Sequence, residues 1–168
     1  MAEKETVFSS KIVYKGVFDF KEFYLFCYNW LTGETGLDVM ETKYEEKITG
    51  ESKEVEIKWM GTKELTDYFK YEAEIITIIR GMTKVEVNQG GVKVDANKGR
   101  LEIKFKGILV RDYKGKFETT AFKKFLRGIY EKWVITSRIE ELQGKVVTES
   151  DEFLSQAKAY LDMEGRKG

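Results

Sequence analysis

Two charged residues, Glu46 and Arg111, occupy positions where a charged side chain could bind a ligand or take part in acid–base chemistry. Glu46 and Arg111 each fall on the apolar phase of a run that alternates apolar and polar residues. An inward carboxylate among aromatic rings has a raised pKa and can act as an acid or bind a ligand. Glu46 and Arg111 could also pair inside a sheet or hold a polar group of a ligand. The alternative for each is a strand end, where the side chain reaches water.

Aromatic residues share the apolar phase with these charges. The chain is 14% aromatic, with 11 Phe, 9 Tyr and 3 Trp, and large rings dominate the area that a core or a pocket buries. They either line a cavity for an apolar small molecule or fill the core. The ligand-binding residues expected from the sequence are Tyr44, Glu46, Trp59, Tyr71, Phe105, Arg111, Ile129 and Trp133.

Several kinds of chemistry lack their usual residues. The chain contains no His, which is the usual general base near neutral pH and the commonest metal ligand. Its single cysteine, Cys27, can form neither an intramolecular disulfide nor a zinc cluster, and it lies in an apolar run typical of a buried helix. We therefore expect no catalytic residue, no metal and no cofactor. An enzyme that uses carboxylates or lysine stays an alternative.

Length and charge favour a single domain, residues 1–168, with no strong attraction for nucleic acid. The 29 basic and 29 acidic residues cancel, whereas nucleic-acid binders usually carry a positive excess. A basic helix face is the local exception, and it can meet phosphates or an acidic partner, or simply be solvated. The sequence shows neither a signal peptide nor a membrane span, which favours the cytoplasm. The residues of the basic face are Lys123, Lys124, Arg127, Lys132 and Arg138.

Periodicity predicts an α+β fold. Residues 10–17 alternate as a strand does, and Asp19 followed by Glu22 is a capping-box pattern that predicts a helix over 20–31. From Asp38 to Leu109 the period is two, with turns at the glycines. Turns are expected at 49–51, 89–91 and 97–99. The result is a curved antiparallel sheet of about six to seven strands packed on a long C-terminal helix.

Two helical segments follow the strands. In the first, which begins at Thr119 or Thr120, an apolar stripe from Phe122 to Trp133 is expected to lie on the sheet, and Gly144 bends or ends the helix. Residues 149–164 are expected to form an accessory C-terminal helix that docks on a second copy or on another protein. Residues 1–9 and 165–168 are expected to be flexible termini. The expected partner-binding residues are Phe153, Leu154, Ala157, Tyr160 and Leu161.

The order strand, helix, meandering strands and long helix resembles the helix-grip layout of the START and Bet v 1-like superfamily over about residues 10–142. That resemblance implies a curved sheet around the C-terminal helix, often with a hydrophobic cavity. Residues 125–130 and 159–166 also resemble uncharacterised small archaeal proteins, a resemblance that implies nothing about activity.

The leading hypothesis is a non-catalytic domain that binds an apolar, lipid-like small molecule. One alternative is a structural or interaction protein that acts through the C-terminal helix, as a homo-oligomer or with another protein. A second is a protein that associates with RNA or the ribosome through the basic helix face.

Overall fold

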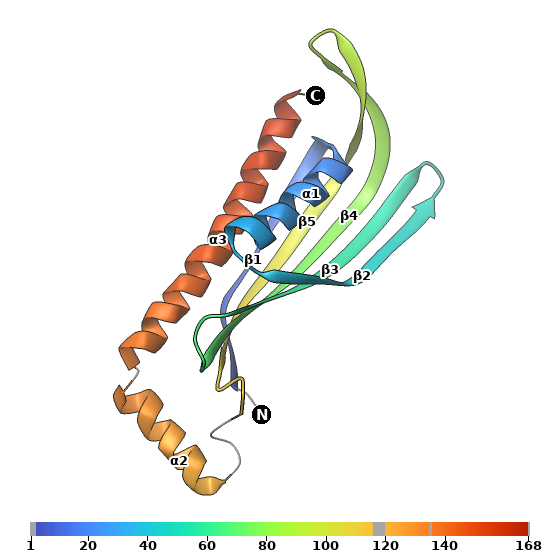
Figure 1. The fold of residues 1–168 in the computed structure, drawn as a ribbon. Coiled ribbons are helices and arrows are strands. Elements are labelled where there is room, and N and C mark those ends of the chain that lie inside the picture. Colours follow the sequence, from blue (N-terminus) through green and yellow to red (C-terminus); the bar gives the residue numbers. More distant parts are fainter. Residues whose placement is uncertain (1–2, 116–119, 135, 168) are drawn as a thin grey trace.

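The structure, a computed structural model, describes residues 3–115, 120–134 and 136–167 (Figure 1). Five strands precede a short helix and a long one, and a helix lies between the first two strands. The elements are β1 (Glu3–Phe18), α1 (Phe20–Asn29), the π-helical turn η1 (Trp30–Glu34), β2 (Asp38–Thr49), β3 (Ser52–Glu64), β4 (Phe69–Gln89), β5 (Val92–Arg111), α2 (Ala121–Ile129), the π-helical turn η2 (Tyr130–Val134) and α3 (Thr136–Lys167).

All five strands join one antiparallel sheet in the order β1-β5-β4-β3-β2. The α+β class, the curved antiparallel sheet and the C-terminal helix are confirmed. The predicted count of six to seven strands is wrong, because β4 and β5 each run for 20 residues or more. A register shift between Arg80 and Thr83 bends β4 without ending it, and Gly81 adopts a φ of 63° there. A bulge of this kind lets one strand bend and continue.

One of the predicted turns explains why the predicted number of strands is too high. The predicted turns at residues 49–51 and 89–91 are confirmed, since two-residue turns join β2 to β3 and β4 to β5. The turn predicted at residues 97–99 is wrong, because these residues lie within β5 and pair with β1, and Asn97 and Lys98 also pair with β4. Asn97 accepts a hydrogen bond from the Phe20 backbone N–H at 3.1 Å. Its polar side chain therefore supports the start of a helix.

β1 begins at Glu3, earlier than the predicted Ser10, and pairs with β5 from Arg111 back to Asn97. Residues 3–9, predicted as a flexible terminus, are therefore part of the sheet, and residues 1–2 lie outside the described residues. At the other end α3 extends to Lys167, and residue 168 lies outside the described part.

α1 begins where the capping box predicts. The Asp19 side chain accepts a hydrogen bond from the Glu22 backbone N–H at 3.1 Å, which satisfies one N–H that the first helical turn leaves free. Phe23 and Cys27 face the sheet and are buried. The helix continues into η1, whose Leu31 is also buried. The predicted helix over residues 20–31 is thus confirmed, with three further residues in the π-helical turn.

α3 covers the inner face of the sheet, on the same side as α1 (Figure 1). It is one continuous helix through Gly144, so the predicted bend or end at this glycine is wrong. A single buried stripe runs along it, and its side chains belong to the same core as the sheet. The stripe comprises Ile139, Leu142, Val146, Ser150, Phe153, Leu154, Ala157 and Leu161.

α2 does not lie on the sheet, which corrects the prediction for its apolar stripe. It lies beyond the end of the sheet where β1 begins and β5 ends (Figure 1). Its apolar side chains are exposed. The place expected for this stripe is taken by α3, which returns along the sheet. None of the described helices is long and apolar enough to cross a bilayer.

Candidate functional site

The rings expected to line a cavity occupy the packed core. Trp59, Tyr71 and Phe105 are buried side chains of three different strands. The Phe105 ring lies 5.6 Å from the ring of Phe153 on α3, measured between centroids. The Tyr71 hydroxyl and the Ser150 hydroxyl are hydrogen bonded at 2.7 Å. Phe105 and Tyr71 therefore contact α3, and the Trp59 ring contacts Tyr24 and Tyr28 of α1, so the three rings fill the space between the sheet and the helices.

The other apolar and aromatic residues expected to bind a ligand lie elsewhere. Tyr44 is an exposed residue of β2, at the edge of the sheet. Ile129 is an exposed residue of α2. Trp133 belongs to η2, and its side chain lies outside the described part of the structure. The structure therefore does not bring the expected ligand-binding residues together around one cavity.

Glu46 reaches water, as the strand-end alternative predicts. It accepts a hydrogen bond from the Tyr44 hydroxyl at 2.8 Å and lies 3.4 Å from the Lys53 ammonium group. The Tyr44 hydrogen bond, more than Lys53, lowers the pKa of Glu46. The raised pKa expected for an inward carboxylate is therefore wrong, and Glu46 is ionised at neutral pH.

Arg111 lies at the other end of the sheet. Its guanidinium group binds the Glu5 carboxylate at 2.5 Å, and Glu131 of η2 is 3.9 Å away. The buried Nε atom has no hydrogen-bond partner among the described residues. Glu46 is paired with Val55 of β3 and Arg111 with Phe69 of β4, near opposite ends of the strands. The two residues therefore do not form the pair that was one of the alternatives.

The residues expected to bind a partner through the C-terminal helix face inward. Phe153, Leu154, Ala157 and Leu161 are buried in the chain's own core. Tyr160 is partly buried, and its ring stacks on the ring of Phe26 with 4.4 Å between centroids. This contact joins α3 to α1. Residues 149–164 are therefore the C-terminal half of α3 and part of the layer that covers the sheet.

An apolar depression lies between α1 and the edge strand β2. Its volume is about 330 Å³, and it is open to solvent. Leu25 and Tyr44, which are 47% and 45% exposed, form opposite parts of the lining. Lys21 supplies the one charged side chain. The lining residues are Phe20, Lys21, Tyr24, Leu25 and Tyr44.

Glu41 anchors the α1 side of this depression, and the sequence pattern did not indicate it. One of its carboxylate oxygens accepts hydrogen bonds from the Tyr24 hydroxyl at 2.7 Å and from the Trp59 indole N–H at 3.1 Å. Burial first, and then the hydrogen bond to Glu41, raises the pKa of Tyr24 to about 12. A register shift between Glu41 and Lys43 explains the missed signal, because one extra residue moves Glu41 to the inner face.

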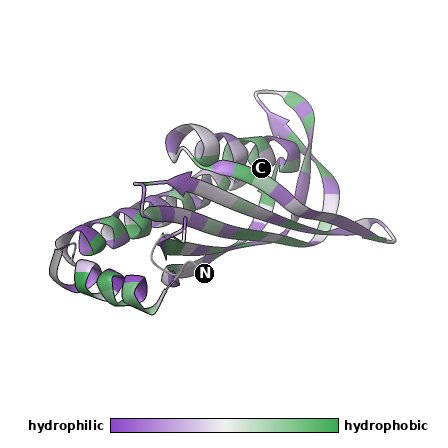
Figure 2. Ribbon diagram, turned by 60° about the horizontal axis from the view of Figure 1, so that its bottom comes forward, coloured by the Kyte–Doolittle hydropathy of each residue, from purple (hydrophilic) through white to green (hydrophobic). Residues whose placement is uncertain are grey.

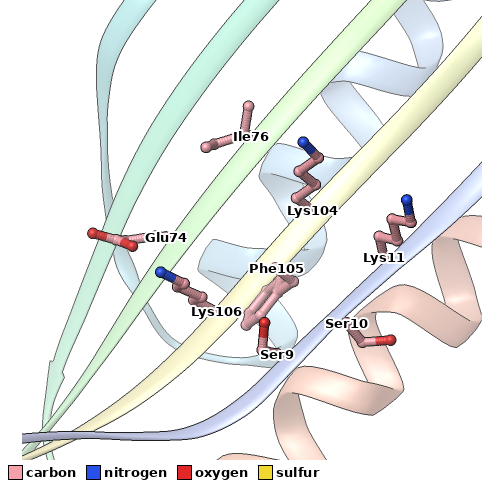
Figure 3. A pocket seen from close by; sticks show the side chains of 8 residues that line it. All are labelled: Ser9, Ser10, Lys11, Glu74, Ile76, Lys104, Phe105 and Lys106. Atoms are coloured by element: carbon pink, nitrogen blue, oxygen red, sulfur yellow. The ribbon is translucent and has the colours of Figure 1, made fainter.

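A second depression lies on the outer face of the sheet, opposite the helices (Figure 3). It has a volume of about 460 Å³, and lysines of β1 and β5 point into it (Figure 3). The neighbouring carboxylate of Glu102 lies 3.1 Å from Arg100 and 3.8 Å from both Lys11 and Lys104. The hydrogen bond from Arg100 is the main reason that the pKa of Glu102 is lowered. These ion pairs neutralise part of the positive charge.

The polar side of α2 faces the body of the protein. Arg127 binds Glu3 at 2.6 Å and lies 3.7 Å from the buried carboxylate of Asp112. Glu131 of η2, one turn later, accepts a hydrogen bond from the Tyr68 hydroxyl at 2.6 Å. The apolar side of α2 is therefore turned away from the body, and Figure 2 shows hydrophobic and hydrophilic residues mixed along this helix.

Cys27 is a buried core residue, and burial raises the pKa of its thiol well above the usual range. We expect the folded protein to react with an aromatic disulfide reagent at least about a hundred-fold more slowly than the chain unfolded in guanidinium, because reaction requires local opening. Raising the pH from 7 to 9 should accelerate both reactions, because the thiol that reacts in the folded protein is the one exposed by local opening, and the difference between the two rates should persist. Absorbance of the released thiolate measures both rates, and equal rates would contradict the burial of Cys27.

Among the residues that the structure describes, no group of three or more Asp, Glu or Cys side chains could hold a metal ion.

Comparison of the chain with protein-family models, curated proteins and solved structures gave no match. The class of the protein is therefore given by its architecture, an α+β fold in which a curved five-stranded antiparallel sheet carries α1 and α3 on one face.

Proposed function

We propose that the protein is a non-catalytic binding domain of the helix-grip type, and that it binds an apolar small molecule in the depression between α1 and β2. Two features support the helix-grip assignment: α1 lies between β1 and β2, and the long helix α3 lies along the inner face of the sheet. The proposed ligand site differs from the internal cavity expected from the sequence, because the inner rings are packed against α1 and α3.

The observation that carries the ligand proposal is the convergence of exposed apolar side chains on one depression. Tyr44 and Leu25 remain about half exposed although each lies beside other apolar groups. The hydroxyl groups of Tyr24 and Tyr44 already donate to Glu41 and Glu46, so the ring faces are left for an apolar ligand. A volume of about 330 Å³ is at the lower end of the range of roughly 300–1,000 Å³ for small-molecule sites.

The charges at the rim indicate the polar part of the ligand. Lys21 lines the depression and is exposed, so it can bind an anionic group of a ligand whose apolar part contacts the rings. Glu46, on the β2 side, is ionised and already accepts from Tyr44. The ligand class that fits is a small amphiphile with a flat or chain-like apolar body and one anionic group.

A dye-binding experiment tests this proposal. 1-Anilinonaphthalene sulfonate combines fused rings with an anionic group, and its fluorescence rises when it leaves water. We expect Tyr44→Ser to weaken its binding about ten-fold or more, because burying a large apolar side chain contributes roughly 1.5–3 kcal/mol. Fluorescence titration measures the dissociation constant.

Two control variants make the result specific. Met40→Ser alters a residue of the same strand that is 67% exposed on the outer face, so it should leave dye binding unchanged. Phe122→Ser reports any dye that binds α2 instead. Equal losses in Tyr44→Ser and Met40→Ser would contradict a site between α1 and β2, as would a loss only in Phe122→Ser.

A further inference from the structure

α2 is held against the protein by its polar side. Arg127 forms ion pairs with Glu3 and Asp112, and Asp112 is buried. In the following turn Glu131 is bound by Tyr68 and lies near Arg111. Helices at the surface of a globular protein usually turn the apolar side inward. The orientation of α2 is the opposite.

The apolar side of α2 therefore points to solvent. Phe122 and Phe125 are 66% and 62% exposed, and Leu126 and Ile129 are exposed as well. These four residues have the spacing i, i+3, i+4 and i+7, which places them along one side of the helix. We call this set, Phe122, Phe125, Leu126 and Ile129, the α2 apolar face.

The charge beside the α2 apolar face is positive. Lys123 follows Phe122 and is exposed, whereas Lys124, three residues before Arg127, lies on the polar side of the helix. Glu131, the one carboxylate between residues 121 and 134, is turned toward the body of the protein. An anionic surface that approaches the α2 apolar face would therefore contact apolar side chains and the ammonium group of Lys123. α2 has no carboxylate that would repel this surface.

The size and shape of the face distinguish a lipid surface from a second copy of the chain. With roughly 150–250 Å² for each aromatic side chain, the α2 apolar face exposes on the order of 400 Å². A stable protein interface buries about 800 Å² on each partner, so this face is too small. The helix lies beyond the end of the sheet, where a flat surface can reach it (Figure 1).

We propose that α2 is a membrane-surface helix, which lies in the plane of an anionic lipid bilayer with the α2 apolar face in the headgroup region and Lys123 against the lipid phosphates. A basic amphipathic helix with aromatic residues on its apolar side binds such interfaces without spanning them. The proposal does not depend on the ligand proposal, because different residues on a different element carry it.

Co-sedimentation of the full chain with vesicles tests this proposal. We expect binding to vesicles of phosphatidylcholine mixed with phosphatidylserine, weaker binding to phosphatidylcholine alone, and a decrease as salt rises, because ions screen the attraction. Replacing both Phe122 and Phe125 by serine should weaken binding at least about ten-fold. Lys123→Gln should weaken it about five-fold.

Matched variants and a second measurement separate the possible outcomes. Lys104→Gln and Lys106→Gln remove the same charge from the outer face of the sheet and should leave vesicle binding unchanged. Circular dichroism should show every variant folded, since the altered residues are exposed or partly exposed. Absence of vesicle binding, equal binding to both vesicle types, or binding indifferent to Phe122 and Phe125 would overturn the proposal. A dimer that sedimentation velocity detects and that Phe125→Ser dissociates would also overturn it, in favour of a second copy.

Discussion

A chain shortened to end at Gly144 should fail to fold. The deletion removes Val146, Phe153, Leu154 and Leu161, which are all buried against the sheet. Loss of one large core side chain costs about 3–5 kcal/mol, and the whole free energy of unfolding of a domain is roughly 5–15 kcal/mol. Near-ultraviolet circular dichroism should show no fixed aromatic environment in the shortened chain.

Single substitutions in α3 measure the contribution of individual side chains to the stability of the fold. Phe153→Ala should lower the free energy of unfolding by about 3–5 kcal/mol, because the Phe153 ring is fully buried and contacts Phe105. Met163→Ala is the control, since Met163 is an exposed residue of the same helix and its truncation should change stability by less than about 0.5 kcal/mol. Urea denaturation measures both. A folded chain ending at Gly144 would show that residues 145–167 are dispensable.

Gly107→Val should destabilise the protein by about 3 kcal/mol. A Cβ atom at this position would lie 2.6 Å from the Ser150 Oγ atom and 3.0 Å from a methyl carbon of Val146, so α3 would have to move away from β5. Gly107→Ala should cost about 1–2 kcal/mol, since it adds one methyl group at the same contact. Urea denaturation again gives the free energies.

Gly144→Ala provides the opposite control on the same helix. No atom lies within 4 Å of a Cβ built at Gly144, and alanine is favoured over glycine in a helix by about 1 kcal/mol. This variant should therefore be more stable than the parent. If Gly144→Ala were destabilising, the continuous helix α3 would be contradicted. If Gly107→Ala were neutral, the close approach of α3 to β5 would be contradicted.

A double-mutant cycle isolates the contact between Gly107 and Ser150. Ser150→Ala alone removes the hydrogen bond between Ser150 and Tyr71 and leaves the buried Tyr71 hydroxyl without that partner. This substitution should cost about 1–3 kcal/mol. Gly107→Ala should cost about 1 kcal/mol less in that background, because the oxygen atom nearest to the new methyl group is gone. If the effects of Gly107→Ala and Ser150→Ala on stability were strictly additive, the strain at residue 107 would arise from a contact other than the one with Ser150.

Much of the local structure was predictable from neighbouring residues. The Asp19 cap, the buried side of α1 and the tight turn at Gly90 and Gly91 depend on short sequence spacings. The candidate site was only partly predictable. Tyr44 lines the depression, as expected for a ring on the apolar phase of its strand, but strict alternation along the same strand puts Glu41 on the outer face. A bulge inserts a single residue between them, and alternation alone does not locate it.

By itself, the sequence determined the helix and strand periods, the α+β class and the burial of Cys27, because these follow from side chains a few positions apart. Only the tertiary structure decided which helix covers the sheet. Both α2 and α3 carry an apolar stripe, but α3 has 32 residues and spans about 48 Å. Strands of 16–21 residues extend over roughly 50–70 Å. The longer helix therefore buries more of the sheet, and the apolar stripe of α2 is left exposed.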